Sequence, residues 1–185
     1  MYESDSNMGV GRVTRPQTMK VWDIAVRLFH WSLVAAIACE FAFRAGTAIH
    51  NSVGYIVLGL IAFRLLWGFA GTSHARFADF VKSPTETLAY VWSILRGHPP
   101  RYVGHNPAGG AMVLALIAMA ALTAGSGFAM TTDALWGEEW IEELHEGVAN
   151  FTLVLIVAHV LGVIVASWQH RENLVKAIIT GRKEL

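Results

Sequence analysis

The sequence predicts an all-α integral membrane protein, a four-helix bundle with both termini on the cytoplasmic side. Of the 185 residues, 54% are hydrophobic and only 15% are charged, and the mean hydropathy is +0.44. This composition is too apolar for an ordinary soluble domain. Four apolar segments each approach the roughly 20 residues that a helix needs to cross a bilayer, and basic residues gather on one side of them.

Residues 1–20 are polar and contain no apolar core. They lack the basic, apolar and small-residue regions of a cleaved signal peptide. We therefore expect a flexible cytoplasmic tail, followed by one transmembrane domain over residues 21–180 whose first span is an uncleaved anchor.

The four predicted spans are residues 22–43, 50–70, 110–130 and 145–168. A helix satisfies its own backbone hydrogen bonds in lipid, as a spanning segment must. The third span has no charged residue, whereas the first carries Arg27, His30 and Glu40 and the second carries Arg64. Ionisable groups inside a membrane are costly, so they mark candidate functional sites.

A polar connection, residues 71–109, joins the second and third spans. Within it, Ser83, Pro84 and Glu86 form the pattern of an N-cap, an N1 proline and a capping-box glutamate. An amphipathic helix of about twelve residues should follow, too short to cross the bilayer and suited to its surface. Asn106 and Pro107 repeat the cap-then-proline pattern before the third span.

Basic residues set the orientation, because cytoplasmic segments of membrane proteins are enriched in Lys and Arg. With four spans, thirteen of the fourteen basic residues fall on the side of the termini, and only Arg44 falls on the other. The opposite side is acidic near the fourth span: Asp133, Glu138, Glu139, Glu142, Glu143 and Glu146. This acidic run is either a solvated surface or a docking surface for a basic partner.

Two histidines on the fourth span, His145 and His159, are fourteen residues apart. Fourteen residues are close to four helical turns, so both imidazoles share one side of the helix about 21 Å apart. Since a bilayer core is about 30 Å thick, one histidine lies near each face.

Depth then predicts two pairs of histidines. His50 begins the second span and matches His145 near the outer face, while His30 matches His159 nearer the inner face. Two facing imidazoles suit the axial positions of a haem iron, whereas structural zinc requires four ligands. The alternative is that they make hydrogen bonds between helices. The three histidines of the connection, His74, His98 and His105, are expected to be exposed.

Arg64 follows His50 by fourteen residues, so it lies at the depth of the inner pair. It either pairs with a haem propionate or extends to the cytoplasmic interface. Glu40 is protonated, paired or at the outer interface, and the sequence leaves these three states open. The single Cys39 and the lack of a C-x-x-C-H motif exclude cysteine-ligated iron–sulfur clusters and covalent c-type haem.

The chain resembles the bacterial cytochrome b561 family, and within it the b-type cytochrome subunits of membrane-bound nickel–iron hydrogenases. The matching segments are VRLFHW at 26–31, HNSVG at 50–54, RLLWGFAG at 64–71, GHNP at 104–107, GFA at 127–129, HE at 145–146 and HV at 159–160. Together they extend over about residues 21–179.

The resemblance implies a multi-pass protein of the bacterial inner membrane with two b haems, whose axial ligands are His30, His50, His145 and His159. Electrons would pass between a quinone pool and a periplasmic redox protein, such as a c-type cytochrome or a hydrogenase. In related formate-dehydrogenase-type subunits, the loop before the third helix helps to line a quinone pocket. Asn106 occupies that position, although its capping role explains it equally well.

Three alternatives to a free electron carrier remain open. In the first, the chain is the anchoring cytochrome subunit of a hydrogenase. In the second, it is a quinone-linked oxidoreductase of a small molecule such as superoxide, and in the third it is a haem-free metal transporter. An acidic outer surface repels a small anion, and paired depths do not suit a transport path. The sequence thus favours an electron-transfer protein over a stand-alone enzyme, and no nucleic-acid partner is expected.

Overall fold

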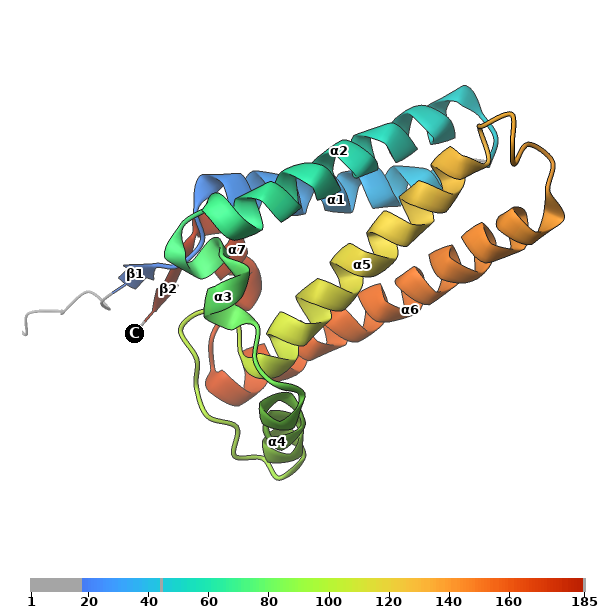
Figure 1. Cartoon of the computed structure of the whole chain (residues 1–185). Helices are drawn as coiled ribbons and strands as arrows, with labels where there is room; N and C mark the ends of the chain where they lie inside the picture. The colour runs from blue at the N-terminus through green and yellow to red at the C-terminus, as the bar shows by residue number, and fades with distance from the viewer. Residues whose placement is uncertain (1–17, 44, 185) are drawn as a thin grey trace, which may run out of the picture.

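The computed structural model describes residues 18–43 and 45–184, which fold mainly into helices (Figure 1). The elements in chain order are β1 (Thr18–Lys20), α1 (Ile24–Ala42), α2 (Ala48–Ala70), a 3₁₀ turn (Ser73–Ala75), α3 (Phe77–Phe80), α4 (Pro84–Leu95), α5 (Pro107–Ala129), α6 (Glu139–His170), α7 (Leu174–Thr180) and β2 (Arg182–Glu184). Most of the predicted tail, residues 1–17, and Arg44 lie outside the described residues.

Four helices, α1, α2, α5 and α6, are long and apolar enough to cross a membrane, which confirms the four predicted spans by length and composition. They run side by side in Figure 1. We call the end that carries β1, β2 and α7 the terminal end. The opposite end, where α1 meets α2 and α5 meets α6, is the loop end.

The start of α6 differs from the prediction. This helix has 32 residues and begins at Glu139 rather than near His145. Glu139 and Glu142 therefore occupy its first turn, where carboxylates are stabilised by the unpaired N–H groups and the helix dipole. Most of the acidic run is thus helical, and its side chains are exposed.

Side-chain caps fix where three of the long helices begin. Asp23 accepts a hydrogen bond from Val26 N at 2.8 Å, and Asn106 accepts one from Gly109 N at 2.7 Å. The second carboxylate oxygen of Asp23 also accepts from Trp67 and Thr72, which ties the start of α1 to the end of α2. Burial of Asp23 opposes ionisation, but these hydrogen bonds outweigh it and lower its pKa.

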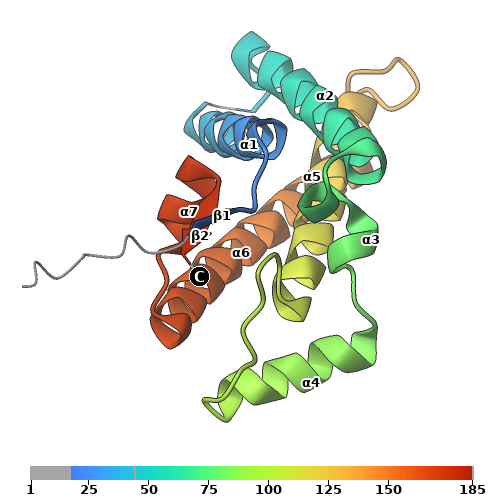
Figure 2. The ribbon, with the colours of Figure 1, turned by 90° about the vertical axis from the view of Figure 1, so that its left-hand side faces the viewer.

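The predicted short helix is confirmed as α4, with twelve residues and both halves of the Ser83–Glu86 capping box. It lies to one side of the long helices, near the start of α5 (Figure 2). Leu88, Trp92 and Leu95 leave 62%, 60% and 71% of their surface exposed. An exposed apolar stripe of this kind suits contact with lipid.

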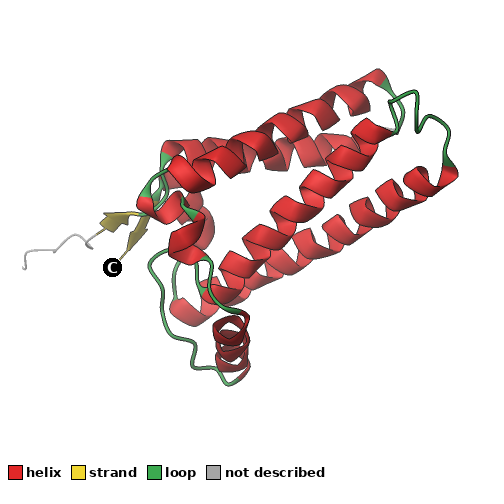
Figure 3. Cartoon of the chain, viewed as in Figure 1, coloured by secondary structure: helices red, strands yellow, loops and turns green. Residues whose placement is uncertain are grey.

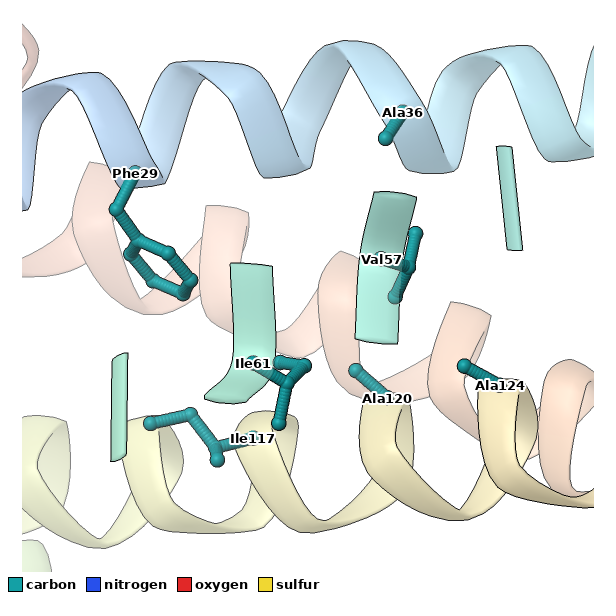
Figure 4. Packing of buried hydrophobic residues seen from close by; sticks show 7 residues of the cluster. All are labelled: Phe29, Ala36, Val57, Ile61, Ile117, Ala120 and Ala124. Atoms are coloured by element: carbon teal, nitrogen blue, oxygen red, sulfur yellow. The ribbon is translucent and has the colours of Figure 1, made fainter. Parts of the chain in front are cut away.

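The buried core joins three of the four long helices (Figure 4). Its residues are Phe29 and Ala36 of α1, Val57 and Ile61 of α2, and Ile117, Ala120 and Ala124 of α5. Helix α6 contributes none of them and packs mainly along α5. One contact there is polar, with Thr123 Oγ1 and Thr152 Oγ1 3.2 Å apart. The helix that carries two of the candidate histidines is therefore held chiefly by one neighbour.

The two ends of the described chain meet in a feature that was not predicted. Strands β1 and β2 pair antiparallel, with Thr18 opposite Glu184 (Figure 3). The carbonyl of Gly181 accepts hydrogen bonds from the N–H groups of Val21 and Trp22 at 2.9 and 3.1 Å. We call β1, α7 and β2 together the terminal clasp.

A charged cluster links the terminal clasp to the connection between α2 and α5. Buried Lys183 lies 3.0 Å from Glu172 and donates to the carbonyl of Tyr102 at 3.1 Å, and Arg101 also pairs with Glu172. Burial of Glu172 opposes ionisation, but Lys183 and Arg101 outweigh it and lower its pKa.

Candidate functional site

Two histidines from different helices lie side by side at the loop end. His50 is in the first turn of α2 and His145 is in the second turn of α6. Their ring centroids are 6.3 Å apart, and the ring planes meet at 78°. Both rings line a cavity of about 470 Å³ whose wall is otherwise largely apolar. Space of this size suits an organic ligand.

The imidazole of His145 is oriented by α5. Its Nδ1 lies 3.0 Å from the carbonyl oxygen of Thr123 and 3.1 Å from the hydroxyl of Ser126. A Cβ added at Gly127 would come within 3.0 Å of the imidazole Cε1, so this glycine makes room for the ring. With Nδ1 engaged, Nε2 is the nitrogen available to a metal, the usual arrangement for a ligating histidine.

The imidazole of His50 is matched with a carboxylate. Nδ1 of His50 lies 2.6 Å from Oε2 of Glu40, and the two side chains are only 21% and 18% exposed. Of the three states that the sequence left open for Glu40, the structure shows the paired one. Neither the carboxylate oxygens nor Nδ1 has a hydrogen bond of regular geometry with a described residue, so the approach of the two groups is a contact between charges.

The second pair, His30 of α1 and His159 of α6, lies toward the terminal end. Both side chains are half-buried. The Nδ1 atom of His30 is buried without a hydrogen bond from any described residue. Helix α6 thus contributes one histidine to each pair, while α1 and α2 contribute the other two.

Arg64 is buried near the terminal end, with only 3% of its surface exposed. Its Nη2 donates to the carbonyl of Ala75 at 3.1 Å, and its guanidinium lies 4.9 Å from the ring centroid of Phe77. Its Nη1 is buried with no hydrogen-bond partner among the described residues. The guanidinium therefore does not extend to the protein surface, and it retains capacity for an anion.

His105 corrects the expectation of an exposed loop residue. Its ring packs between Trp22 and Phe80, with both centroid distances at 4.6 Å, because the connection folds back over the start of α1. Burial lowers the pKa of His105 to about 3, and the nearby charge of Arg64 adds to the effect. His98 is exposed as expected, and His74 is half-buried.

A second cavity, of about 310 Å³, lies beside His105 at the terminal end. Its wall includes His74, Phe80, Tyr102 and His105 from the connection. Asn106 is not part of this wall, since its side chain caps α5 instead. The burial of His105 could not be predicted from the sequence, because that loop is enclosed only in the tertiary fold.

Comparison with known proteins identifies the type of protein. A profile of prokaryotic cytochrome b561 matches residues 21–181. The chain belongs to this cytochrome b561 family. A probable Ni/Fe-hydrogenase B-type cytochrome subunit of Cupriavidus necator is 28% identical, covering 87% of this chain and 85% of the relative. Its counterpart in Azotobacter vinelandii is 26% identical over 74% of this chain and 69% of the relative. No solved structure gives a significant match.

Membership of this family makes the chain a bacterial membrane b-type cytochrome that acts in electron transfer, and haem b is the implied cofactor. The loop-end pair fits an iron ligated on two sides. Two imidazoles on a largely apolar cavity are a donor set that could hold the iron of haem b. Among the described residues no three His, Cys, Asp or Glu side chains converge as for a bare metal ion.

Proposed function

We propose that this cytochrome b561 carries two b haems and passes electrons across the bacterial inner membrane, between a periplasmic redox protein and the quinone pool. The observation that carries the proposal is the 6.3 Å approach of the His50 and His145 rings over a 470 Å³ cavity. Residues 21–180 form the di-haem domain. The terminal end is cytoplasmic and the loop end periplasmic, as the distribution of Lys and Arg favours.

Four histidines hold the two haems. His50 and His145 are the axial ligands at the loop end, and His30 and His159 are those nearer the terminal end. When bound, haem supplies reversible one-electron chemistry, while the protein sets its position and surroundings. Arg64 offers its unpaired Nη1 to a propionate of the inner haem. A buried guanidinium needs such an anionic partner.

The cavity beside His105 is our candidate for the quinone site. It lies at the terminal end, on the side of Arg64 and of the inner histidine pair. The rings of Phe80 and Tyr102 in its wall suit a flat apolar head group, and the imidazoles of His74 and His105 supply polar contacts. Asn106 supports this wall by capping α5 and so fixing the backbone next to His105.

The outer partner is a redox protein that docks at the loop end. The curated relatives are named as hydrogenase cytochrome subunits, which supports a hydrogenase as one candidate. The exposed carboxylates around the start of α6 support a partner with a basic surface, such as a c-type cytochrome. In both cases electrons enter or leave near His145, and the protein acts as an electron-transfer component.

The decisive experiment measures haem content and spectra of single histidine variants. Wild-type protein should hold two low-spin b haems in a pyridine haemochrome assay. His50→Ala and His145→Ala should lose the same haem, and His30→Ala and His159→Ala the other. The exposed His98→Ala is the control and should retain both. A wild-type content near zero would refute the proposal, and loss of one haem by both His50→Ala and His159→Ala would refute the pairing.

A further inference from the structure

We propose that Glu40 is a positioning residue of the loop-end haem, whose carboxylate accepts the Nδ1 proton of His50 and lowers the reduction potential of the iron. This inference rests on the proposed ligation by His50. Nδ1 and Oε2 lie 2.6 Å apart across the contact between α1 and α2. If His50 binds iron through Nε2, Nδ1 carries the proton, and the facing carboxylate is its acceptor.

The surroundings of Glu40 leave His50 as its main partner. The carboxylate is on an apolar helix and is 18% exposed, a position that is costly for an unpaired charge. No described residue gives its oxygens a hydrogen bond, and His50 is the charged partner that approaches them. The backbone of His50 is fixed in turn by its N–H bond to the Thr47 hydroxyl at 3.3 Å.

The two ligands of the loop-end pair therefore have unlike partners. Nδ1 of His145 contacts a carbonyl and a hydroxyl, which are neutral, whereas Nδ1 of His50 contacts a carboxylate. A carboxylate makes a ligating imidazole more basic and a better donor to the metal. It also places negative charge near the iron, which favours the ferric over the ferrous state.

A potential difference between the two ends follows. Glu40 lowers the potential at the loop end, and the buried cation of Arg64 raises it at the terminal end. With haems bound at both ends, these two charges would favour transfer of an electron from the loop end to the terminal end. The electron donor is the periplasmic redox protein, and no covalent bond changes.

The test is a redox titration of the full-length protein with both haems bound. Glu40→Gln keeps the size of the side chain and removes its charge, so the midpoint of the loop-end haem should shift to a more positive potential. Its low-spin electron paramagnetic resonance g values should shift as well. The midpoint of the inner haem should stay unchanged. Glu40→Asp, which retains the charge, should stay closer to wild type.

Asp133→Asn is the matched control, because Asp133 is an exposed acid near the loop end that neither lines this cavity nor pairs with His50. An equal shift in Asp133→Asn, or no shift in Glu40→Gln, would overturn the role of Glu40 and leave the ligation intact. If Glu40→Gln loses the loop-end haem, retention by Glu40→Asp supports the proposal and loss by both overturns it. Failure of the proposed function can be told apart from failure of the role of Glu40, because the wild-type protein itself would then lack the loop-end haem.

Discussion

At the scale of single residues, a glycine on α5 decides how closely the imidazole of His145 approaches. We predict that Gly127→Ala lowers the content of loop-end haem, because the added Cβ would come within 3.0 Å of the ring. The control is Gly125→Ala, whose Cβ would meet nothing within 4 Å. In a helix, replacing Gly by Ala without a new contact should raise the free energy of unfolding by about 0.5–1 kcal/mol. Equal haem content in the two variants would contradict the prediction.

Arg64 is the residue expected to tune the inner haem. A cation favours the reduced state of a nearby iron, so Arg64→Leu should lower the inner midpoint potential. We expect a shift on the order of 60 mV, which is about a tenfold change for one electron. The control is Arg96→Leu, since Arg96 is exposed on the end of α4. If the inner midpoint stays unchanged in a redox titration, Arg64 does not tune the haem. Its role is then structural, through its contacts with Ala75 and Phe77.

His105 should make the terminal end sensitive to acid. Its pKa is about 3 in the folded chain against an ordinary 6.5, so the unfolded chain binds a proton more readily. Its contribution to stability is therefore complete above pH 6.5 and declines as the pH falls toward 3. The free energy of unfolding should fall by at most about 1.4 kcal/mol for each pH unit.

Thermal unfolding in detergent at pH 7.5 and pH 5 measures this dependence. His105→Gln should unfold with less difference between the two pH values than wild type. His98→Gln, at an exposed position, should retain the wild-type difference. Identical pH dependence in His105→Gln and His98→Gln would show that protonation of His105 is not coupled to folding.

At the scale of elements, the terminal clasp depends on the backbone of Gly181. This residue has φ +79°, and a Cβ there would lie 2.6 Å from the carbonyl oxygen of Trp22. Gly181→Ala should therefore lower the free energy of unfolding by more than Gly46→Ala. Gly46 has φ +76° but open space, so its variant has only the backbone strain of about 1 kcal/mol. Equal melting temperatures for the two variants would mean that the Trp22 contact is easily relieved.

The elements that the sequence predicted are those with local signals. The cap at Ser83 and the twelve residues after it could be read from adjacent residues, as could the four spans. The start of α6 was missed because the acidic residues before His145 resemble a loop, although carboxylates also stabilise a first helical turn. The terminal clasp has no local signal, since β1 and β2 have three residues each and lie at opposite ends of the chain.

The candidate site also has features that the sequence could predict and features that it could not. Helical spacing and membrane depth led to the pairing of His50 with His145, whose rings lie side by side in the structure. Their partners were beyond reach of the sequence, because Glu40 is on α1 and Ser126 is on α5. Which residue faces Nδ1 depends on how the helices are rotated against one another, and helical spacing within one segment does not give that rotation.

At the scale of the whole molecule, charge is distributed unevenly between the two ends. Buried or paired cations gather at the terminal end, including Arg64, Arg101 and Lys183. Exposed carboxylates gather at the loop end around the start of α6. Such a distribution favours approach of a basic protein to the end where His50 and His145 lie.

The acidic surface is therefore expected to control the rate of electron exchange with the outer partner. Its carboxylates in α6 lie within two turns of His145, and Trp136 nearby is 75% exposed. Trp136 suits either contact with the partner or a place at the membrane interface. The rate should fall as salt rises, because exposed charges are screened beyond about 8 Å at physiological ionic strength.

Replacing Glu138, Glu139, Glu142 and Glu143 together by Gln should slow this exchange and flatten its salt dependence, with haem content unchanged. A basic c-type cytochrome is the probe, and stopped-flow absorbance gives the rate at several salt concentrations. The control is Glu86→Gln, an exposed acid of the connection near the terminal end whose replacement keeps the capping box, and it should behave as wild type. If the quadruple variant retains wild-type rates at low salt, the acidic surface faces solvent and takes no part in docking. The partner then binds elsewhere or is a permanently assembled subunit, in which case long-range attraction no longer limits the rate.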